Sequence, residues 1–267
     1  MKVHKHNYKN HEVVWHIFGT GKRPLIALHG FGDKGTSFAR LESLQTHFTI
    51  YALDLPFHGK TRWNAPAYSA AALLDLILDL SATYNIQNYT MLGHSYGARL
   101  IFTLLPDLYP SVEQLYLLAP DGIQTRSGKA ARLSPLWLRR TLTQVLEPPD
   151  RFFCFLKYIG AKYWMPRNSY QFIHLHLSRP HRRQRTFGTW LSMADFPMEA
   201  HLVKKLLQQY PVSTDIFLGK KDVIIPPHSG YLLKHLPCVQ LHILDIGHEM
   251  IDEKLDQYLS STLAVSL

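Results

Sequence analysis

The sequence predicts an α/β fold in which helices cover both faces of a mostly parallel sheet. Two observations predict it. Short apolar runs alternate along the chain with helical patterns, which is typical of βαβ units. Two of the runs, residues 26–28 and 115–118, are apolar without alternation. Both faces of these strands are therefore expected to be buried, as in a parallel sheet.

The elements follow in order along the chain. Strands are expected at residues 12–18, 24–28, 49–53, 89–92, 113–118, 213–218 and 240–244. Helices are expected at residues 69–84, 98–108 and 252–263. The first of these helices carries an apolar stripe, Leu73, Leu76, Ile77 and Leu80, which predicts the side that packs on the sheet.

Residues 125–206 break the alternation and are rich in proline and aromatic residues, as expected of several short helices. We interpret residues 1–124 and 207–267 as two parts of one core, and residues 125–206 as an inserted helical cap. The cap has 15 Lys and Arg against 4 Asp and Glu, whereas the rest of the chain has 14 against 16. Such a local excess is usually a solvated face, but it can also attract an anionic substrate.

Composition argues against several classes of protein. No apolar run approaches the roughly 18 residues of a membrane span, and the polar residues 1–10 lead us to expect a cytoplasmic protein. Cys154 and Cys238 are far apart in the sequence and lack the spacing of a metal or redox site, so no metal is expected. We expect no other cofactor. Despite a sequence pI near 9.5, no nucleic-acid-binding module is recognisable. The oligomeric state is left open.

The strongest local pattern is Gly-His-Ser-Tyr-Gly at residues 93–97, between a predicted strand and a predicted helix. A nucleophile on such a sharp turn needs glycine two positions to either side, because side chains there would collide with neighbouring elements. The helix N-terminus favours developing negative charge. Ser95 is therefore the candidate nucleophile.

This pattern resembles the nucleophile elbow of the α/β-hydrolase superfamily, and the resemblance extends over nearly the whole chain. Residues 28–32, Leu-His-Gly-Phe-Gly, resemble the oxyanion loop of that superfamily. The resemblance implies that the backbone N–H groups of Phe31 and Tyr96 hold the oxyanion. Residues 54–59 are similar to its Asp-x-Pro-Gly-His-Gly turn, but Phe57 replaces the glycine, which puts the local loop shape in question.

The same resemblance suggests the other two catalytic residues. Asp222 follows Phe-Leu-Gly-Lys-Lys at the end of a late strand and is favoured as the acid, while Asp121 at the end of an earlier strand is a rival. His248 lies on a loop between the last strand and the last helix, where an imidazole can act as general base. The chain order Ser, Asp, His is that of the superfamily.

The expected function is that of a serine hydrolase acting on a carboxylic ester or related small acyl substrate, with an anionic substrate as one option. His29 and Arg99 are candidate substrate contacts. The Ser-x-Gly-small-Arg run that ends at Arg99 resembles the lyase of menaquinone biosynthesis, so lyase or C–C bond hydrolase chemistry on an anionic substrate is an alternative. A non-catalytic binding module is a further alternative, although such modules usually lose a triad residue.

Overall fold

The computed structural model describes residues 1–123 and 179–266. The chain divides into two compact units. The first consists of residues 1–64, 69–127 and 196–267, and the second of residues 65–68 and 128–195. Residues 196–206, which we placed in the inserted segment, therefore belong to the first unit. The described part of the second unit consists mainly of one helix, α8 (Pro180–Ser192).

The first unit is built on an eight-stranded sheet in the order β1-β2-β4-β3-β5-β6-β7-β8. β2 runs antiparallel to β1 and to β4, and the remaining neighbours are parallel. The strands are β1 (Lys2–Tyr8), β2 (His11–Phe18), β3 (Arg23–Leu28), β4 (Phe48–Asp54), β5 (Tyr89–His94), β6 (Val112–Leu118), β7 (Ser213–Gly219) and β8 (Val239–Leu244). The predicted mostly parallel α/β sheet is confirmed.

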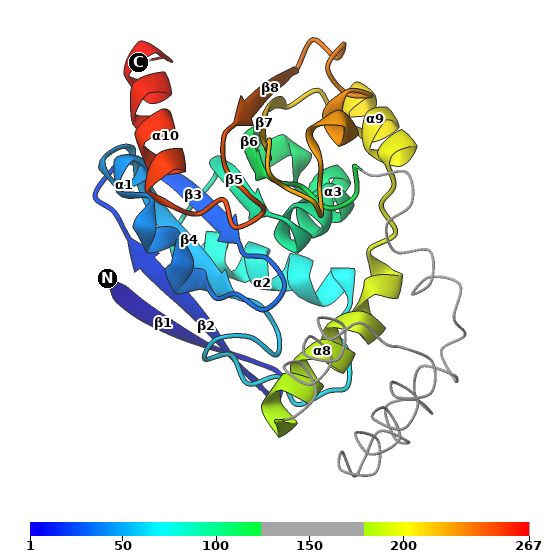
Figure 1. Ribbon diagram of the computed structural model, residues 1–267. Coiled ribbons are helices and arrows are strands. Elements are labelled where there is room, and N and C mark those ends of the chain that lie inside the picture. Colours follow the sequence, from blue (N-terminus) through cyan, green and yellow to red (C-terminus); the bar gives the residue numbers. More distant parts are fainter. Residues whose placement is uncertain (124–178, 267) are drawn as a thin grey trace, which may run out of the picture. The chain divides into compact units, whose positions relative to one another are not determined.

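Helices of the first unit cover both faces of this sheet (Figure 1). On one face α1 (Glu42–His47) packs against α10 (Glu253–Ser266). On the other face α3 (Tyr96–Leu108) contacts both α2 (Ala70–Thr83) and α9 (Ala200–Gln209). This layering explains why the central strands are apolar on both sides.

The helix α2 shows how the local sequence sets an element. The Ser69 hydroxyl accepts a hydrogen bond from the Ala72 N–H at 3.1 Å and caps the helix, a contact worth about 1 kcal/mol. The apolar stripe predicted from the sequence is buried: Leu73, Leu76, Ile77 and Leu80. Each such side chain stabilises the fold by roughly 1.5–3 kcal/mol.

The edge strand β1 was not predicted, and its composition explains why. Its outward-facing residues, such as Lys5, are exposed, and its inward-facing residues are His4, His6 and Tyr8 in place of aliphatic side chains. The Tyr8 hydroxyl donates to the Asp75 carboxylate on α2 at 2.8 Å. Aromatic and polar contacts thus attach β1, and they leave no aliphatic alternation in the sequence.

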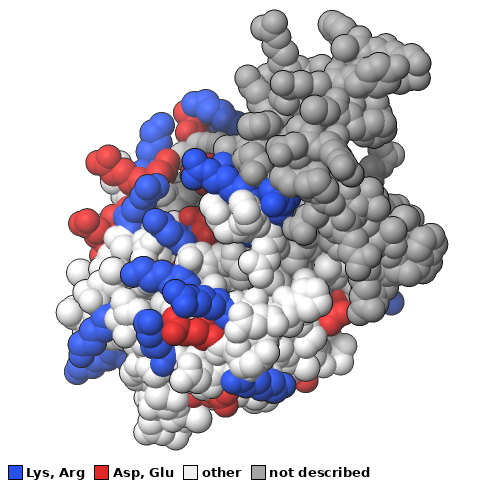
Figure 2. Space-filling model, turned by 90° about the horizontal axis from the view of Figure 1, so that it is seen from below, with Lys and Arg blue, Asp and Glu red and all other residues white. Residues whose placement is uncertain are grey.

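The excess of basic residues falls mostly outside the described part of the chain. Of the 15 Lys and Arg residues in 125–206, nine precede residue 179. The others are Arg179, Arg182, Arg183, Arg185, Lys204 and Lys205. On the face drawn in Figure 2, Lys and Arg (blue) lie interspersed with Asp and Glu (red) over the described part of the surface. The described surface on that face is thus of mixed charge.

The parallel strands bring the predicted site residues to one edge of the sheet. β3 and β5 to β8 all end at the same edge, so the loops that follow them gather there. Every residue of β5 is buried, as are the last four residues of β3. Among residues 1–123 and 179–266, no helix has the length and apolar character needed to cross a bilayer.

Candidate active site

Ser95 occupies a strained turn between β5 and α3. Its φ of 49° and ψ of −112° are unusual for a residue other than glycine, and such backbone strain costs about 1–3 kcal/mol. The Ser95 N–H donates to the Leu118 carbonyl at 2.8 Å, and the Ser95 carbonyl accepts from the Asp121 N–H at 3.1 Å. These bonds to the end of β6 hold the turn in place.

Two glycines make this turn sterically possible. A Cβ on Gly97 would lie 1.9 Å from the Leu28 carbonyl oxygen, and a Cβ on Gly93 would lie 2.7 Å from the Ala98 Cα. Both distances are far inside van der Waals contact, and both neighbours are backbone atoms that cannot move aside. The structure therefore gives the same reason for the glycines that the sequence suggested.

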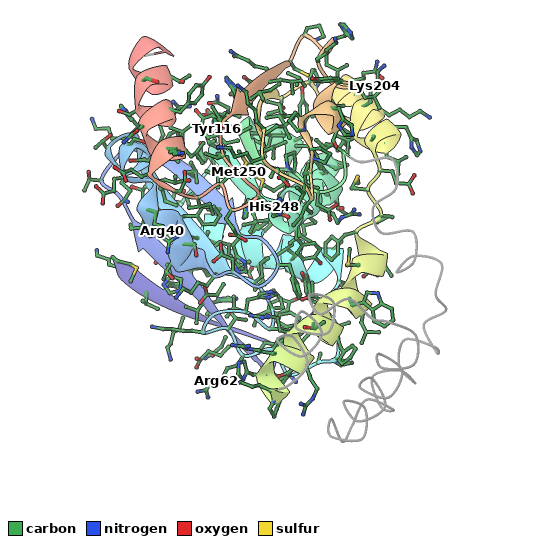
Figure 3. The ribbon with its side chains drawn as sticks, viewed as in Figure 1. Arg40, Arg62, Tyr116, Lys204, His248 and Met250 are labelled. Carbon is green, nitrogen blue, oxygen red and sulfur yellow. The ribbon has the colours of Figure 1, made fainter. Side chains whose placement is uncertain are left out.

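The structure brings Ser95, His248 and Asp222 together, although they come from three separate loops. The Ser95 Oγ lies 3.0 Å from His248 Nε2, and His248 Nδ1 lies 2.8 Å from the Asp222 carboxylate. Figure 3 shows His248 on the loop that joins β8 to α10. A carboxylate only accepts hydrogen bonds, so Nδ1 carries the proton and Nε2 is left to accept from the serine hydroxyl.

Asp222 is itself held firmly on the loop after β7. Its second oxygen accepts the N–H groups of Ile224 and Ile225, both at 2.8 Å, and the residue is only 3% exposed. These two backbone donors fix the orientation of the carboxylate on its loop. Asp222 is thus placed to orient the His248 imidazole and to stabilise its protonated form.

Asp121, the rival acid, is occupied elsewhere. Its carboxylate accepts from Arg99 Nε at 2.7 Å and from Arg99 Nη2 at 2.9 Å, a bidentate pair. This geometry is the most favourable one for a guanidinium and a carboxylate. Of the two candidate acids, Asp222 is therefore the one that the structure places beside the imidazole.

Arg99, which we expected to contact substrate, lies in a buried set of hydrogen bonds. The side chain is only 3% exposed, and besides Asp121 it donates to the backbone carbonyls of Phe196 at 3.0 Å and Met198 at 3.1 Å. Arg99 thereby ties α3 to the loop after β6 and to the segment before α9.

The predicted oxyanion loop lies directly against the nucleophile. A Cβ on Gly30 would sit 3.4 Å from the Ser95 Cβ and 2.9 Å from His94 Nδ1. Phe31 follows Gly30 with 38% of its surface exposed, and Tyr96 is the first residue of α3. The two backbone N–H groups named from the sequence thus belong to the two segments that flank Ser95.

His29, which we also expected to contact substrate, is enclosed in the structure. Its side chain is fully buried. Nδ1 donates to the Gly30 carbonyl at 2.7 Å, while Nε2 accepts from the Leu55 N–H at 3.1 Å. Burial lowers the pKa of His29 and so favours this neutral form. With both nitrogens occupied, His29 instead joins the oxyanion loop to the loop after β4.

His58, which the sequence analysis did not single out, makes the reciprocal connection. Its Nε2 accepts from the Gly32 N–H at 3.1 Å, and its Nδ1 donates to the Pro56 carbonyl at 2.9 Å. Each loop therefore contributes one histidine whose Nε2 accepts a backbone N–H of the other. The sequence could have pointed to this pair, because His29 lies in the motif at residues 28–32 and His58 lies in the motif at residues 54–59.

The turn at residues 54–59, in which Phe57 takes the place of the expected glycine, is held by hydrogen bonds to Asp54. The buried Asp54 carboxylate accepts from His16 Nε2 at 2.9 Å, from the Gly35 N–H at 2.7 Å and from the Lys60 N–H at 2.8 Å. Phe57 adopts the left-handed φ of 69° that a glycine there would take freely, at a cost of about 1–2 kcal/mol. The hydrogen bonds of Asp54 offset this strain.

Comparisons with known proteins agree with this architecture. Residues 23–153 match the family model described as alpha/beta hydrolase fold. A probable serine hydrolase of Drosophila melanogaster is 38% identical over 98 residues, which are 35% of this chain and 30% of the fly protein. The match thus spans less than a third of that relative's length.

Solved structures extend the likeness over the whole chain. An esterase from Thermogutta terrifontis has a TM-score of 0.71 at 18% identity, and each chain is covered to 99%. The thioesterase domain from the curacin biosynthetic pathway has a TM-score of 0.69 at 13% identity, again with 99% of each chain covered. At these identities the likeness concerns the fold. Together with the family model over residues 23–153, it shows that the chain has the alpha/beta hydrolase fold.

Proposed function

We propose that this protein is a serine hydrolase that cleaves a carboxylic ester or a related acyl substrate. The observation that supports the proposal most directly is the hydrogen-bonded series from Ser95 through His248 to Asp222, with distances of 3.0 and 2.8 Å. In this order a neutral imidazole accepts the serine proton while a buried carboxylate fixes its tautomer.

In the first half of the proposed reaction, Ser95 Oγ attacks the acyl carbon as His248 Nε2 takes its proton. The negative charge that develops on the acyl oxygen is stabilised by the N–H groups of Phe31 and Tyr96 and by the N-terminus of α3. The bond between the acyl carbon and the leaving group then breaks, and His248 gives its proton to the leaving group. An acyl group remains on Ser95.

In the second half, a water molecule attacks the acyl carbon and gives a proton to His248 Nε2. The tetrahedral intermediate collapses, the Ser95 oxygen recovers its proton from His248, and the acid is released. Asp222 serves both halves in the same way, because the imidazole becomes protonated once in each.

The lyase alternative loses its main support in the described structure. It depended on Arg99 as a contact for substrate carboxylates, and the Arg99 guanidinium is engaged with Asp121 and two backbone carbonyls. The binding-module alternative would suit a chain that lacks a triad residue. All three residues are present here at hydrogen-bonding distance, which favours catalysis.

The charge of the inserted segment suggests a narrower version of the proposal. We propose that residues 125–206 form a helical cap and that its excess of 15 basic over 4 acidic residues favours an anionic acyl substrate. This version can fail while the hydrolase proposal stands, because the triad lies outside the segment.

The experiment is a hydrolysis assay with p-nitrophenyl esters from acetate to palmitate. The wild-type protein should hydrolyse at least one of them, and Ser95→Ala and His248→Ala should each lower the rate by several orders of magnitude. The double variant should be no worse than either single one, because the residues act as a unit. Equal rates for the wild type and Ser95→Ala would contradict the proposal.

A further inference from the structure

Another histidine, His94, lies beside the proposed nucleophile, and the proposed reaction does not use it. His94 is the last residue of β5, and only 3% of it is exposed. Its Nε2 lies 3.0 Å from the backbone carbonyl oxygen of His248. A carbonyl only accepts, so Nε2 must carry a proton and donate. The residue before the nucleophile thus holds the backbone of the proposed general base.

The other ring nitrogen fixes the state of His94. Burial lowers the pKa of His94, which favours the neutral ring, and with the proton on Nε2 the Nδ1 atom is bare. In the part of the chain that the structure describes, this Nδ1 has no hydrogen-bond partner. It faces Gly30, where a Cβ would approach it to 2.9 Å. One ring therefore contacts the oxyanion loop and the loop of the base at once.

The loop that carries His248 is attached on the N-terminal side of the base, where the Lys221 N–H donates to the Ile246 carbonyl at 3.0 Å. It has no regular secondary structure between the end of β8 at Leu244 and the start of α10 at Glu253. A Cβ on Gly247, directly before the base, would meet no described atom within 4 Å. The Asp222 contact fixes the His248 ring, and the His94 bond holds the backbone carbonyl of the same residue.

We propose that His94 is a positioning residue that holds the His248 backbone so that Nε2 lies within reach of Ser95. The inference rests on the proposed function, since it concerns the base of that reaction. The hydrogen bond from His94 to the His248 carbonyl, taken alone, contributes little to stability. Its effect on turnover is expected to be larger, because a displacement of about 1 Å at a reacting group can cost 10²-fold.

Three variants at position 94 separate the hydrogen bond from simple packing. His94→Gln keeps a donor at the position of Nε2, His94→Met keeps similar bulk without a donor, and His94→Asn has a donor that is too short to reach. Each is compared with the wild type for kcat and KM on p-nitrophenyl butyrate. The rate of Ser95 labelling by a fluorophosphonate probe is measured as well.

His94→Met and His94→Asn should lose about 10- to 100-fold in kcat and labelling rate with little change in KM. His94→Gln should recover most of this loss. Hydrogen–deuterium exchange at residues 246–251 should increase in the Met and Asn variants and stay near the wild-type level in the Gln variant. If His94→Met does not fold, the Gln and Asn variants still make the comparison.

Equal losses in all three variants, or no loss in any, would overturn the inference. So would unchanged hydrogen–deuterium exchange at residues 246–251 in the Asn variant. Failure of the proposed function looks different. In that case wild-type Ser95 is not labelled at all, whereas the exchange of this loop would still report whether His94 holds it.

Discussion

The Arg99 guanidinium holds the Asp121 carboxylate through two hydrogen bonds, of 2.7 and 2.9 Å, at the edge of the sheet where the candidate site lies. Asp222 lies at the same edge and is paired with His248 at 2.8 Å. Two carboxylates that the sequence offered as rivals for one role thus have different partners, and substitutions should separate the two roles.

Asp222→Asn should lower kcat by about 10⁴-fold, if the effect of the corresponding change in chymotrypsin carries over, because the imidazole loses its orientation and tautomer. Asp121→Asn should keep most of the turnover but lower the midpoint of thermal unfolding, since it leaves Arg99 buried without its counter-charge. Steady-state kinetics and thermal denaturation of both variants check this. The reverse ranking in kcat would move the acid to Asp121.

Arg99→Met should destabilise the fold by about 3–5 kcal/mol, because it leaves the Asp121 carboxylate without its buried partner. The double variant Arg99→Met with Asp121→Leu should recover part of this loss. Urea denaturation provides the measurement. Lys221→Met is a matched control, since it breaks an exposed pair with Asp245 and should change stability little.

The same Arg99→Met variant should treat acidic and neutral esters alike if the arginine is structural. A loss confined to acidic esters, with unfolding unchanged, would restore Arg99 as a substrate contact.

The parallel strands, and the three residues that the structure brings together at the candidate site, could be predicted from the sequence because each leaves a local pattern. Strands buried on both faces read as apolar runs, and the elbow at Ser95 needs glycines at fixed positions. The strand β1 could not be predicted, because its inner face packs through His4, His6 and Tyr8. A polar edge strand has no aliphatic alternation.

The roles of the buried histidines and of Arg99 could not be predicted for a different reason. They depend on backbone groups distant in sequence: the Leu55 N–H for His29, the His248 carbonyl for His94, and the Phe196 carbonyl for Arg99. Any residue type supplies such groups. The sequence therefore shows the side chain but does not show its partner.

Stability should fall in mild acid because histidines are buried in the neutral form. Burial lowers the pKa of His94 and of His29 below the ordinary value of about 6.5. The unfolded chain then binds more protons as pH falls through 6.5. The contribution of each buried neutral histidine to the free energy of unfolding is therefore complete above about pH 6.5. Below that pH it is lost, by up to about 1.4 kcal/mol per pH unit for each histidine.

His94→Gln should therefore have a smaller decrease in unfolding free energy between pH 7.5 and 5.5 than the wild type. Urea denaturation at the two pH values measures it, and the exposed His235 provides the control substitution His235→Gln. If His94→Gln and His235→Gln both keep the wild-type pH dependence, His94 is not a buried neutral group.

The basic segment leads to a prediction about substrate charge. If its excess of Lys and Arg attracts the substrate, kcat/KM for an acidic ester should fall as salt rises, while a neutral ester of equal length should hardly respond. Kinetics between about 0.02 and 0.5 M NaCl test this. Equal salt dependence for the two esters would show that the charge of residues 125–206 does not select the substrate.

The most direct test of the central claim is covalent labelling followed by peptide mapping. A fluorophosphonate should react with the folded wild-type protein at Ser95, and the modified peptide should be the one that contains the motif at residues 93–97. Ser95→Ala should remain unlabelled while showing the same thermal unfolding as the wild type, and His248→Ala should react far more slowly. An adduct that persists in Ser95→Ala, or that maps to another residue, would contradict the assignment of Ser95 as the nucleophile.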